Sequence, residues 1–448
     1  MPLKNYIIVL FFLMISKPIL AQEQWSLEEC VAYAIAHNLQ VKDLSYTTQS
    51  NKETYKQSIR DVLPRVSADS DYLIRFGRSV DPNDNSIVNT DFFSNNYSLG
   101  ASLDIFQGFQ KINSIKASKF LYKATKEEAL QEKYLLAFRV MQAFYDIQFA
   151  EGLLAISKEQ QQVSQANYDL VKKQIDLGVK AGADLYEAES LLLSDKLTVT
   201  QSKNQLIAAK LSLIQEMNLE NATDISIRAS LPEKTDDNIA VESGAIFSKA
   251  QEFLPILKAR ELQVKAAKKQ VAVARGALYP SLSLGGDIGT GFFETTVDES
   301  GETIPFRDQF RDNTFRRIGF FLSVPISNGW SRRSAVKQQK IAYLRAKNNL
   351  EQQRQELFQT IEQLVQEHNA LQIEYAQSLQ KVEAQQLSFT IAQKRYEKGL
   401  INALDLFTAK NLFASAQNEN LLVRLRSEVN KSTLDFYNGL PIFNINAK

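Results

Sequence analysis

Apolar and polar residues alternate with a period of two in several segments of the chain, and this is the pattern of β-strands. The clearest segments are YSLGASLDI (97–105) and RRIGFFLSVPI (316–326). Weaker alternation begins at Val66 and at Leu282. We therefore predict four strands of the length that a tilted membrane strand needs, at about 65–77, 95–106, 281–293 and 314–327.

The two faces of these predicted strands differ in polarity. In the second strand, leucine and isoleucine occupy one face, whereas Ser98, Ser102 and Asp104 occupy the other. A soluble sheet with one buried face is the alternative. The polar face and the long polar loops at 77–95 and 294–313 favour a barrel wall, because a water-filled lumen satisfies polar groups that a closed core would leave without partners.

Helical periodicity covers most of the remaining chain. From Gly108 to Leu177, roughly 70 residues would extend about 105 Å at the helical rise. Within this stretch apolar residues recur at steps of three and four, in the series Leu130, Tyr134, Phe138, Met141 and Tyr145. Only 17 Gly and 10 Pro punctuate the 448 residues, so we predict long antiparallel coiled-coil helices.

The chain also repeats itself at a spacing of 221 residues. Gly178 corresponds to Gly399, Asp184 to Asp405, and the aromatic Phe109 to Trp330. We predict a tandem duplication in which each half folds to the same unit. The expected boundaries are a signal peptide at 1–21, a first repeat at 22–225 with its helical hairpin at 108–218, a link at 226–242, and a second repeat at 243–448 with its hairpin at 329–438.

The N-terminal segment reads as a secretory signal peptide. Lys4 precedes the apolar run Ile7–Ile15, and Ala21 offers a small residue for cleavage. A retained membrane anchor is the alternative, although the run is short for a membrane span. No later apolar run is long enough for a transmembrane helix, so we expect any insertion into a membrane to use the strands.

Composition argues against several classes of function. The formal net charge of +1 gives no reason to expect nucleic acid as a partner. Two His and a single Cys make no metal cluster, and no catalytic constellation is visible. We therefore expect no enzyme activity, no cofactor and no metal site. Cys30 falls on the apolar face of a predicted helix, where a small core residue is expected.

Four strands cannot close a barrel by themselves. Open strand edges in lipid would leave backbone groups without partners at a cost of several kcal/mol each. If the strands lie in a membrane, several copies of the chain must share one barrel. Phe109 and Trp330, at equivalent strand-to-helix junctions, are then expected at the membrane interface, with a packed core as the alternative.

A helix that breaks about 70 residues from the strands must turn back there as a hairpin. Gly178 and Gly399 allow the tight reversal. Asp184 and Asp405 stand at the start of the returning helices, where carboxylates cap free N–H groups. Beyond this structural role, we expect the tips to close and open a channel mouth and to contact a partner protein.

The motifs together resemble the outer-membrane efflux channel family of TolC. The resemblance rests on SLEECVAYAIAHN, the prolines that end the helices before the strands, DIFQGF and PISNGW, and the tip motifs LGVKAGADLYEAE and RYEKGLINALDLFTA, and it covers essentially the whole chain after the signal peptide. It implies a mainly α fold with a transmembrane β-barrel portion. A helical coiled-coil barrel would continue a trimeric 12-stranded β-barrel with four strands per chain.

The resemblance also implies partners and gate residues. A homotrimer in the lipid of the outer membrane would extend its helices into the periplasm, toward a periplasmic adaptor and an inner-membrane transporter of RND or ABC type. By position, Asp184, Tyr396 and Asp405 match the residues that hold the family's closed entrance. Ile401 replaces an arginine of the best-known members, and Thr408 a second acidic residue, which predicts a weaker or differently built lock.

The function implied is a passive exit duct of a tripartite efflux or type I secretion system, energised by the inner-membrane partner. A periplasmic adaptor is one alternative, but such proteins have one helical hairpin rather than two. A soluble coiled-coil scaffold is another, and it has no use for a signal peptide or for strands of membrane length. An enzyme is a third alternative, and the sequence shows no candidate catalytic site for it.

Overall fold

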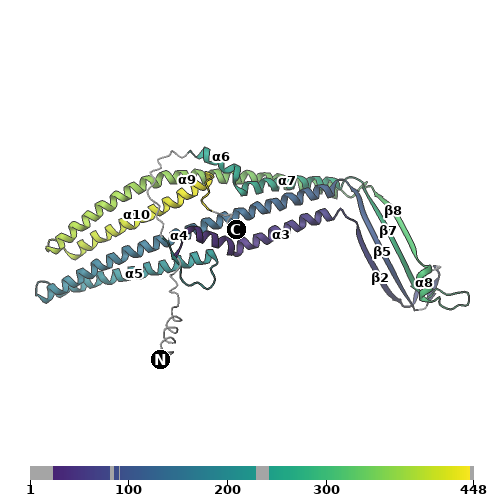
Figure 1. Ribbon diagram of the computed structural model, residues 1–448, viewed down its shortest axis with the longest axis horizontal. Coiled ribbons are helices and arrows are strands. Elements are labelled where there is room, and N and C mark those ends of the chain that lie inside the picture. Colours follow the sequence, from purple (N-terminus) through teal and green to yellow (C-terminus); the bar gives the residue numbers. More distant parts are fainter. Residues whose placement is uncertain (1–23, 81–84, 90, 229–241, 444–448) are drawn as a thin grey trace, which may run out of the picture. The chain divides into compact units, whose positions relative to one another are not determined.

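The computed structural model describes residues 24–80, 85–89, 91–228 and 242–443 (Figure 1). The first half of the chain contains β1 (Gln24–Trp25), α2 (Leu27–His37), α3 (Leu39–Arg60), β2 (Arg65–Arg75), β3 (Arg78–Val80), β4 (Ile87–Asn89), β5 (Phe92–Gln107), α4 (Gln110–Asp176), α5 (Gly182–Met217) and β6 (Ser226–Ile227). The second half contains α6 (Ser243–Phe253), α7 (Pro255–Gly276), β7 (Ser281–Phe293), α8 (Phe306–Asp312), β8 (Phe315–Ser323), α9 (Ser331–Glu397) and α10 (Ala403–Tyr437).

Four helices of the first half, α2, α3, α4 and α5, have counterparts of nearly equal length in α6, α7, α9 and α10 of the second half. Helices α4 and α9 have 67 residues each, and α3 and α7 have 22 each. The chain divides into two compact units. A helical unit takes residues up to 45, 129–255 and those from 354 onward, and a sheet unit takes 46–128 and 256–353. No helix in the described part of the chain combines the length and the apolar character needed to cross a membrane.

The sheet unit contains a four-stranded antiparallel sheet in the order β2-β5-β7-β8 (Figure 1). Its register aligns Leu99 with Ile288 and Leu284 with Phe320, so that apolar side chains gather on one face. On β5 and β7 serine, glycine and aspartate occupy the opposite face, and β8 adds Arg317 and Phe321 to it. Within the described residues, β2 and β8 each pair with a strand on one side only, which leaves two open edges.

Two strand limits differ from the prediction. Strand β5 begins at Phe92 rather than near residue 95, because its first residues pair with the end of β2 at Arg75. Strand β8 ends at Ser323 and does not reach 327. Pro325 accounts for this early end, because proline has no backbone N–H to donate to a strand ladder.

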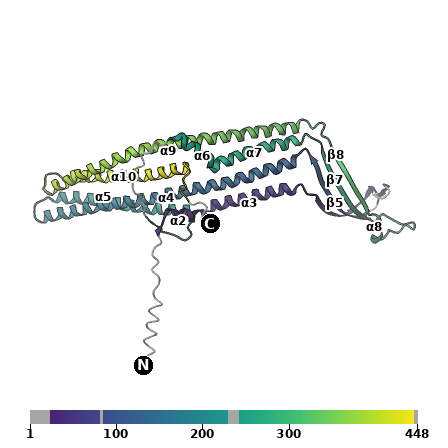
Figure 2. The same cartoon turned by 45° about the horizontal axis from the view of Figure 1, so that its top comes forward.

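The loops predicted as merely polar contain further structure. The loop after β2 includes the short antiparallel pair of β3 and β4. The loop after β7 contains α8, whose Phe310 ring lies 5.7 Å from that of Tyr97, while Phe306 lies 5.7 Å from Phe292. These contacts fix α8 against the apolar face of the sheet, at the end where the loops emerge (Figure 2).

The strand-to-helix junctions use consecutive residues in left-handed backbone conformation. Gly108 and Phe109 have φ values of +57° and +62°, and Gly329 and Trp330 have +58° and +64°. At the first junction a side chain could not fit, because a Cβ on Gly108 would lie 2.2 Å from the carbonyl oxygen of Gly276. An aromatic residue with a positive φ, Phe109 or Trp330, thus stands at the equivalent junction in each half.

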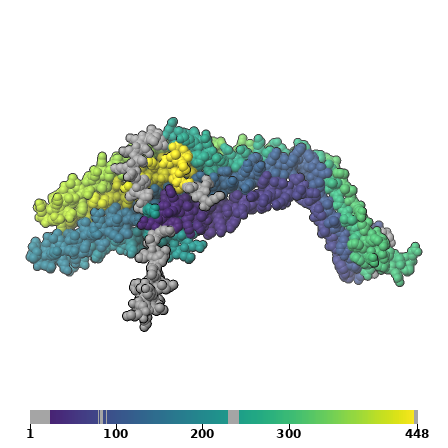
Figure 3. Space-filling view, in the orientation of Figure 1, coloured from purple at the N-terminus to yellow at the C-terminus, as the bar shows by residue number. Residues whose placement is uncertain are grey.

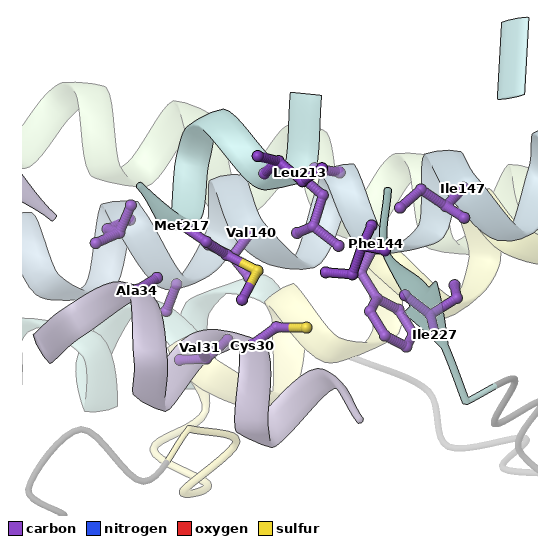
Figure 4. Packing of buried hydrophobic residues seen from close by; sticks show 14 of the residues in the cluster. Cys30, Val31, Ala34, Val140, Phe144, Ile147, Leu213, Met217 and Ile227 are labelled. Atoms are coloured by element: carbon purple, nitrogen blue, oxygen red, sulfur yellow. The ribbon is translucent and has the colours of Figure 1, made fainter. Parts of the chain in front are cut away.

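The helical unit contains two long hairpins, α4 with α5 and α9 with α10, whose turns lie at the same end of this unit (Figures 1 and 2). Its main core brings α2 onto the first hairpin (Figure 4). Cys30, Phe144 and Met217 are almost completely buried there. Burial raises the pKa of the Cys30 thiol to about 12, which makes it an inert core residue.

Both ends of the first repeat pack into the same core. Ser26 begins α2 with a reciprocal capping box, since its hydroxyl accepts from the Glu29 N–H at 3.2 Å and its own N–H donates to the Glu29 carboxylate at 2.8 Å. Strand β1 pairs in parallel with β6. The predicted link at 226–242 therefore begins with a strand, because Ile227 is buried in the core. The segment predicted as a signal peptide and most of the predicted link lie outside the described residues.

Candidate functional site

The hairpin turns are the candidate functional site, and both turns are built alike. Gly178 has a φ of +73° and Gly399 one of +71°, a conformation that glycine adopts without steric cost. The N–H of Gly178 donates to the carbonyl of Ile175 at 2.8 Å, and the N–H of the next residue, Val179, reaches back to Gln174 at 2.8 Å. These two hydrogen bonds end α4, and the equivalent two at Gly399 and Leu400 end α9 in the same way.

The returning helices begin differently from each other. The Asp184 carboxylate accepts a hydrogen bond from the backbone N–H of Ala181 at 3.3 Å, so this residue closes the start of α5. At the start of α10, the Asn402 side chain accepts from the backbone N–H of Asp405 at 2.8 Å. The prediction that the Asp405 carboxylate caps this helix was wrong, because Asn402 already occupies the capping position. The Asp405 side chain remains exposed at the tip.

A small apolar cluster joins the two tips. Tyr396, Ala403 and Leu406 of the second hairpin are buried, and Leu170 and Leu191 of the first hairpin pack against them. In the space-filling view the second hairpin lies along the blue first hairpin (Figure 3).

Ile401 packs against the same cluster. Where the resemblance leads one to expect an arginine, this chain places an apolar side chain. Ile401 therefore contributes buried apolar surface, rather than a charge, to the contact between the tips.

Lys180 supplies a polar link between the tips. Its Nζ donates to the Tyr396 hydroxyl at 3.2 Å and lies 4.9 Å from the centroid of the same ring. The link joins the turn of the first hairpin to α9 of the second. Sequence reasoning selected Tyr396 and missed Lys180, although Lys180 is the one basic residue between Asp176 and Asp184.

The remaining predicted residue at the tip makes a local contact. The Thr408 hydroxyl donates to the Leu404 carbonyl of its own helix at 2.8 Å. The structure therefore places Asp405 and Thr408 on the exposed start of α10 and brings only Tyr396 into contact with the first hairpin. A groove of about 610 Å³ lies beside Asp405, and Ile391 and Arg395 line it.

The tips also expose apolar side chains around these polar groups. The exposed fractions are 78% for Leu177, 71% for Val179, 74% for Tyr186 and 64% for Leu400. Exposed apolar residues gathered around a turn suit a contact with another protein.

Behind the tips, a buried ion pair crosses between the hairpins. Lys410 of α10 meets Asp195 of α5, and its Nζ also donates to the Ser164 hydroxyl of α4 at 2.7 Å. Burial lowers the pKa of Lys410, and the contact with Asp195 opposes this shift. No pattern in the sequence singled out these three residues.

The two aromatic residues at the strand-to-helix junctions belong to the sheet unit. Phe109 and Trp330 are 62% and 68% exposed in the single chain, so neither packs into a core within it. Phe106 meets Phe109 edge to face, and the Arg333 guanidinium lies 4.4 Å from the Trp330 ring. In the part of the chain that the structure describes, no group of three or more His, Cys, Asp or Glu side chains could hold a metal ion.

The sequence matches a family model described as outer membrane efflux protein, over residues 31–218 and 246–439. It is 22% identical over 414 residues to the probable efflux pump outer membrane protein TtgC of Pseudomonas putida, covering 90% of this chain and 81% of that protein. It is 20% identical over 400 residues to the cation efflux system protein CusC of Escherichia coli K12, covering 86% and 80%.

Solved structures share the fold. The chain aligns with a crystal structure of CusC at a TM-score of 0.76 and 18% identity, covering 92% of each chain. It aligns with the outer membrane protein VceC of Vibrio cholerae at a TM-score of 0.77 and 15% identity, covering 92% of this chain and 96% of that one.

Proposed function

The chain belongs to the outer membrane efflux protein family, and we propose that three copies of it form one channel that closes at the hairpin tips. Membership makes it an outer-membrane efflux channel with periplasmic helices, and not an enzyme. The matches give no support to the alternative of a periplasmic adaptor. The proposal concerns the assembly of three copies, the gate at the hairpin tips and the partner proteins.

The observation that carries the proposal is the pair of open edges on the four-stranded sheet. In lipid, each unpaired backbone group costs several kcal/mol, so the edges β2 and β8 need partners. The sheet is antiparallel throughout and has an even number of strands, so β8 of one copy runs antiparallel to β2 of the next. Three copies paired in this way would give twelve strands without an edge.

The helical unit offers matching surfaces for such a contact between copies. Exposed apolar residues follow α5 at helical steps, in the series Tyr186, Leu193, Leu197, Ile207 and Leu211. A second series follows α9, with Ile373, Leu387 and Ile391. The steps are 7, 4, 10 and 4 residues on α5 and 14 and 4 residues on α9, and each is a sum of the three- and four-residue steps of a coiled-coil seam. We infer that the α5 seam of one copy packs against the α9 seam of its neighbour.

The closed state rests on contacts at the tips. The Lys180–Tyr396 link and the apolar cluster around Leu406 hold the two hairpins of each chain together. Three exposed Asp405 carboxylates, one from each copy, would surround the mouth. Transport would be passive, and opening would follow when partner proteins bias the tip contacts.

The partners proposed are a periplasmic adaptor and an inner-membrane transporter of RND or ABC type. One relative is named as the probable outer membrane protein of an efflux pump and another as a protein of a cation efflux system, and both names support the existence of such partners. The exposed apolar residues at the tips, such as Leu177 and Leu400, provide the surface that the adaptor would contact.

Conductance of the purified protein in planar lipid bilayers tests the proposal. We expect a small resting conductance that Asp405→Ala changes, since removing a ring of carboxylates alters the field at the mouth. Asp176→Ala is the matched control, because Asp176 is an exposed carboxylate at the end of α4. An unchanged conductance in Asp405→Ala would remove this residue from the gate, and no conductance from any variant would contradict the channel.

A further inference from the structure

Two neighbouring arginines of β8 lie on opposite faces of the sheet. Arg317 aligns with Asp287 of β7 and forms an ion pair with it at 3.0 Å, on the polar face. Arg316 aligns with Ile288 and therefore lies on the apolar face. Its side chain is exposed, and among the described residues it has no hydrogen-bond or ion-pair partner. Arg316 thus lacks the counter-ion that Arg317 has.

The apolar face itself cannot supply a counter-ion to Arg316. By register, none of the described residues on this face of β2, β5, β7 and β8 is an Asp or a Glu. In the proposed trimer β8 pairs with β2 of the next copy, and the carboxylates of that strand, Asp69 and Asp71, lie on its polar face. On its apolar face β2 carries Val66, Ala68, Ser70, Tyr72 and Ile74. Assembly therefore leaves Arg316 without a carboxylate partner.

Aromatic rings gather on the same face, at the end of the sheet where the loops emerge. The Tyr72 ring lies 4.3 Å from that of Phe93, which lies 5.7 Å from Phe292. The Phe310 ring of α8 lies 5.7 Å from Tyr97. Membrane barrels carry such aromatic girdles at their interfaces with water. Because the periplasmic helices leave the opposite ends of the strands, this girdle belongs to the outer surface of the membrane in the proposed channel.

Arg316 stands between this girdle and the apolar part of the strand. The Thr314 hydroxyl, two residues earlier, donates to the Phe310 carbonyl of α8 at 3.1 Å. Two residues of a strand span about 7 Å, which is comparable with the length of an arginine side chain. Beyond Arg316 the face continues with Ile318 and Phe320, which are 79% and 71% exposed. The arginine stem can therefore lie along apolar surface while the guanidinium reaches the level of the lipid headgroups.

We propose that Arg316 binds the phosphate of a lipid headgroup in the outer leaflet of the membrane. A guanidinium donates two parallel N–H bonds to a phosphate, and the phosphate supplies the missing counter-ion. The acyl chains of the same lipid lie along the exposed Ile318 and Phe320. Each trimer has three such sites, and the bound lipids fix the depth of the strands in the bilayer. This inference rests on the proposed channel, in which the strands lie in lipid.

Native mass spectrometry of the detergent-solubilised trimer tests the inference, with bisphosphorylated lipid A as the added lipid. We expect Arg316→Gln to weaken lipid binding about fivefold per site, which corresponds to about 1 kcal/mol for one basic residue at an anionic membrane surface. Arg317→Gln is the matched control, because it removes the same charge from the adjacent residue on the polar face. This control should bind the lipid like the wild type. Arg316→Lys keeps the charge but loses the paired bonds, so its affinity should lie between those of the wild type and Arg316→Gln.

Two further additions identify the chemistry that Arg316 recognises. Diacylglycerol has acyl chains but no phosphate, so it should bind equally to the wild type and to Arg316→Gln. Inorganic phosphate has no acyl chains and should not displace the bound lipid A. A preference of the wild type for diacylglycerol over Arg316→Gln, or displacement by inorganic phosphate, would overturn the assignment to a lipid phosphate.

The same spectra separate this inference from the proposed channel, because they also give the number of chains. Intact trimers in which Arg316→Gln and Arg317→Gln bind lipid A equally would overturn the inference and leave the channel standing. If Arg316→Gln does not assemble, Arg316→Lys decides, and binding equal to the wild type would overturn the inference. If the wild-type protein itself forms no trimer, the channel fails and this inference fails with it.

Discussion

Removal of the Lys180 side chain should weaken the closed state of the channel by a calculable amount. Lys180→Met removes a hydrogen bond from a charged donor to the Tyr396 hydroxyl and a cation above the same ring. For a half-buried site we take the low end of each range, about 1.5 kcal/mol for the bond and about 0.5 kcal/mol for the cation–π contact. The sum is about 2 kcal/mol per chain, which is about 30-fold in the closed-to-open equilibrium of one chain.

Single-channel recording in planar bilayers measures this change as open probability. Tyr396→Phe provides a graded comparison, since it removes the hydroxyl but keeps the ring beneath the Lys180 ammonium. We expect a shift of about tenfold for this variant, because only the bond worth about 1.5 kcal/mol is lost. Lys172→Met, which removes an exposed lysine from α4 of the same hairpin, should gate like the wild type.

The relative sizes of the two shifts in open probability test whether the Lys180 contacts hold the closed state. If Lys180→Met leaves the open probability unchanged, the link does not hold the closed state. If Tyr396→Phe opens the channel more than Lys180→Met does, the Tyr396 hydroxyl holds the closed state through a contact other than the one with Lys180. Both results would refute the reasoning from the Lys180 contacts.

Three further variants, with Gly319→Ala as a control for the third, test the packing within each unit. Phe144→Ala empties a buried site in the main core and should lower the unfolding free energy of the helical unit by about 3–5 kcal/mol in denaturant titrations. Ser26→Ala removes the cap of α2 and should cost about 1 kcal/mol in the same assay. Gly285→Ala would place a Cβ 3.0 Å from the Phe321 ring and should lower the melting temperature of the assembled protein, whereas Gly319→Ala, at 3.5 Å from that ring, should not.

Much of the fold could be predicted from the sequence because the spacing of its apolar residues keeps one period over long segments. The coiled-coil steps from Leu130 to Tyr145 fall within α4, and the alternation around Leu99 falls within β5. The places where a single residue ends an element, although the apolar pattern continues, were harder to predict. Pro325 shortened β8 although Val324 and Ile326 continue its alternation, and a seven-residue helix appeared in a loop that looked polar.

The candidate site was only partly predictable, for a different physical reason. Gly178, Gly399 and Asp184 act through neighbours within a few residues, so local motifs are enough to place them. The contacts of Lys180 with Tyr396 and of Lys410 with Asp195 join residues 216 and 215 positions apart. Many lysines lie along these helices, and no periodicity tells which of them will be buried against a partner hairpin.

The central claim is that the open strand edges join three copies into one closed sheet. The most direct measurement is the number of chains in the purified particle, taken by native mass spectrometry after release from detergent. The account predicts a particle of three chain masses that persists without cross-linking. A stable single chain, released from detergent with both edges β2 and β8 still unpaired, would contradict it.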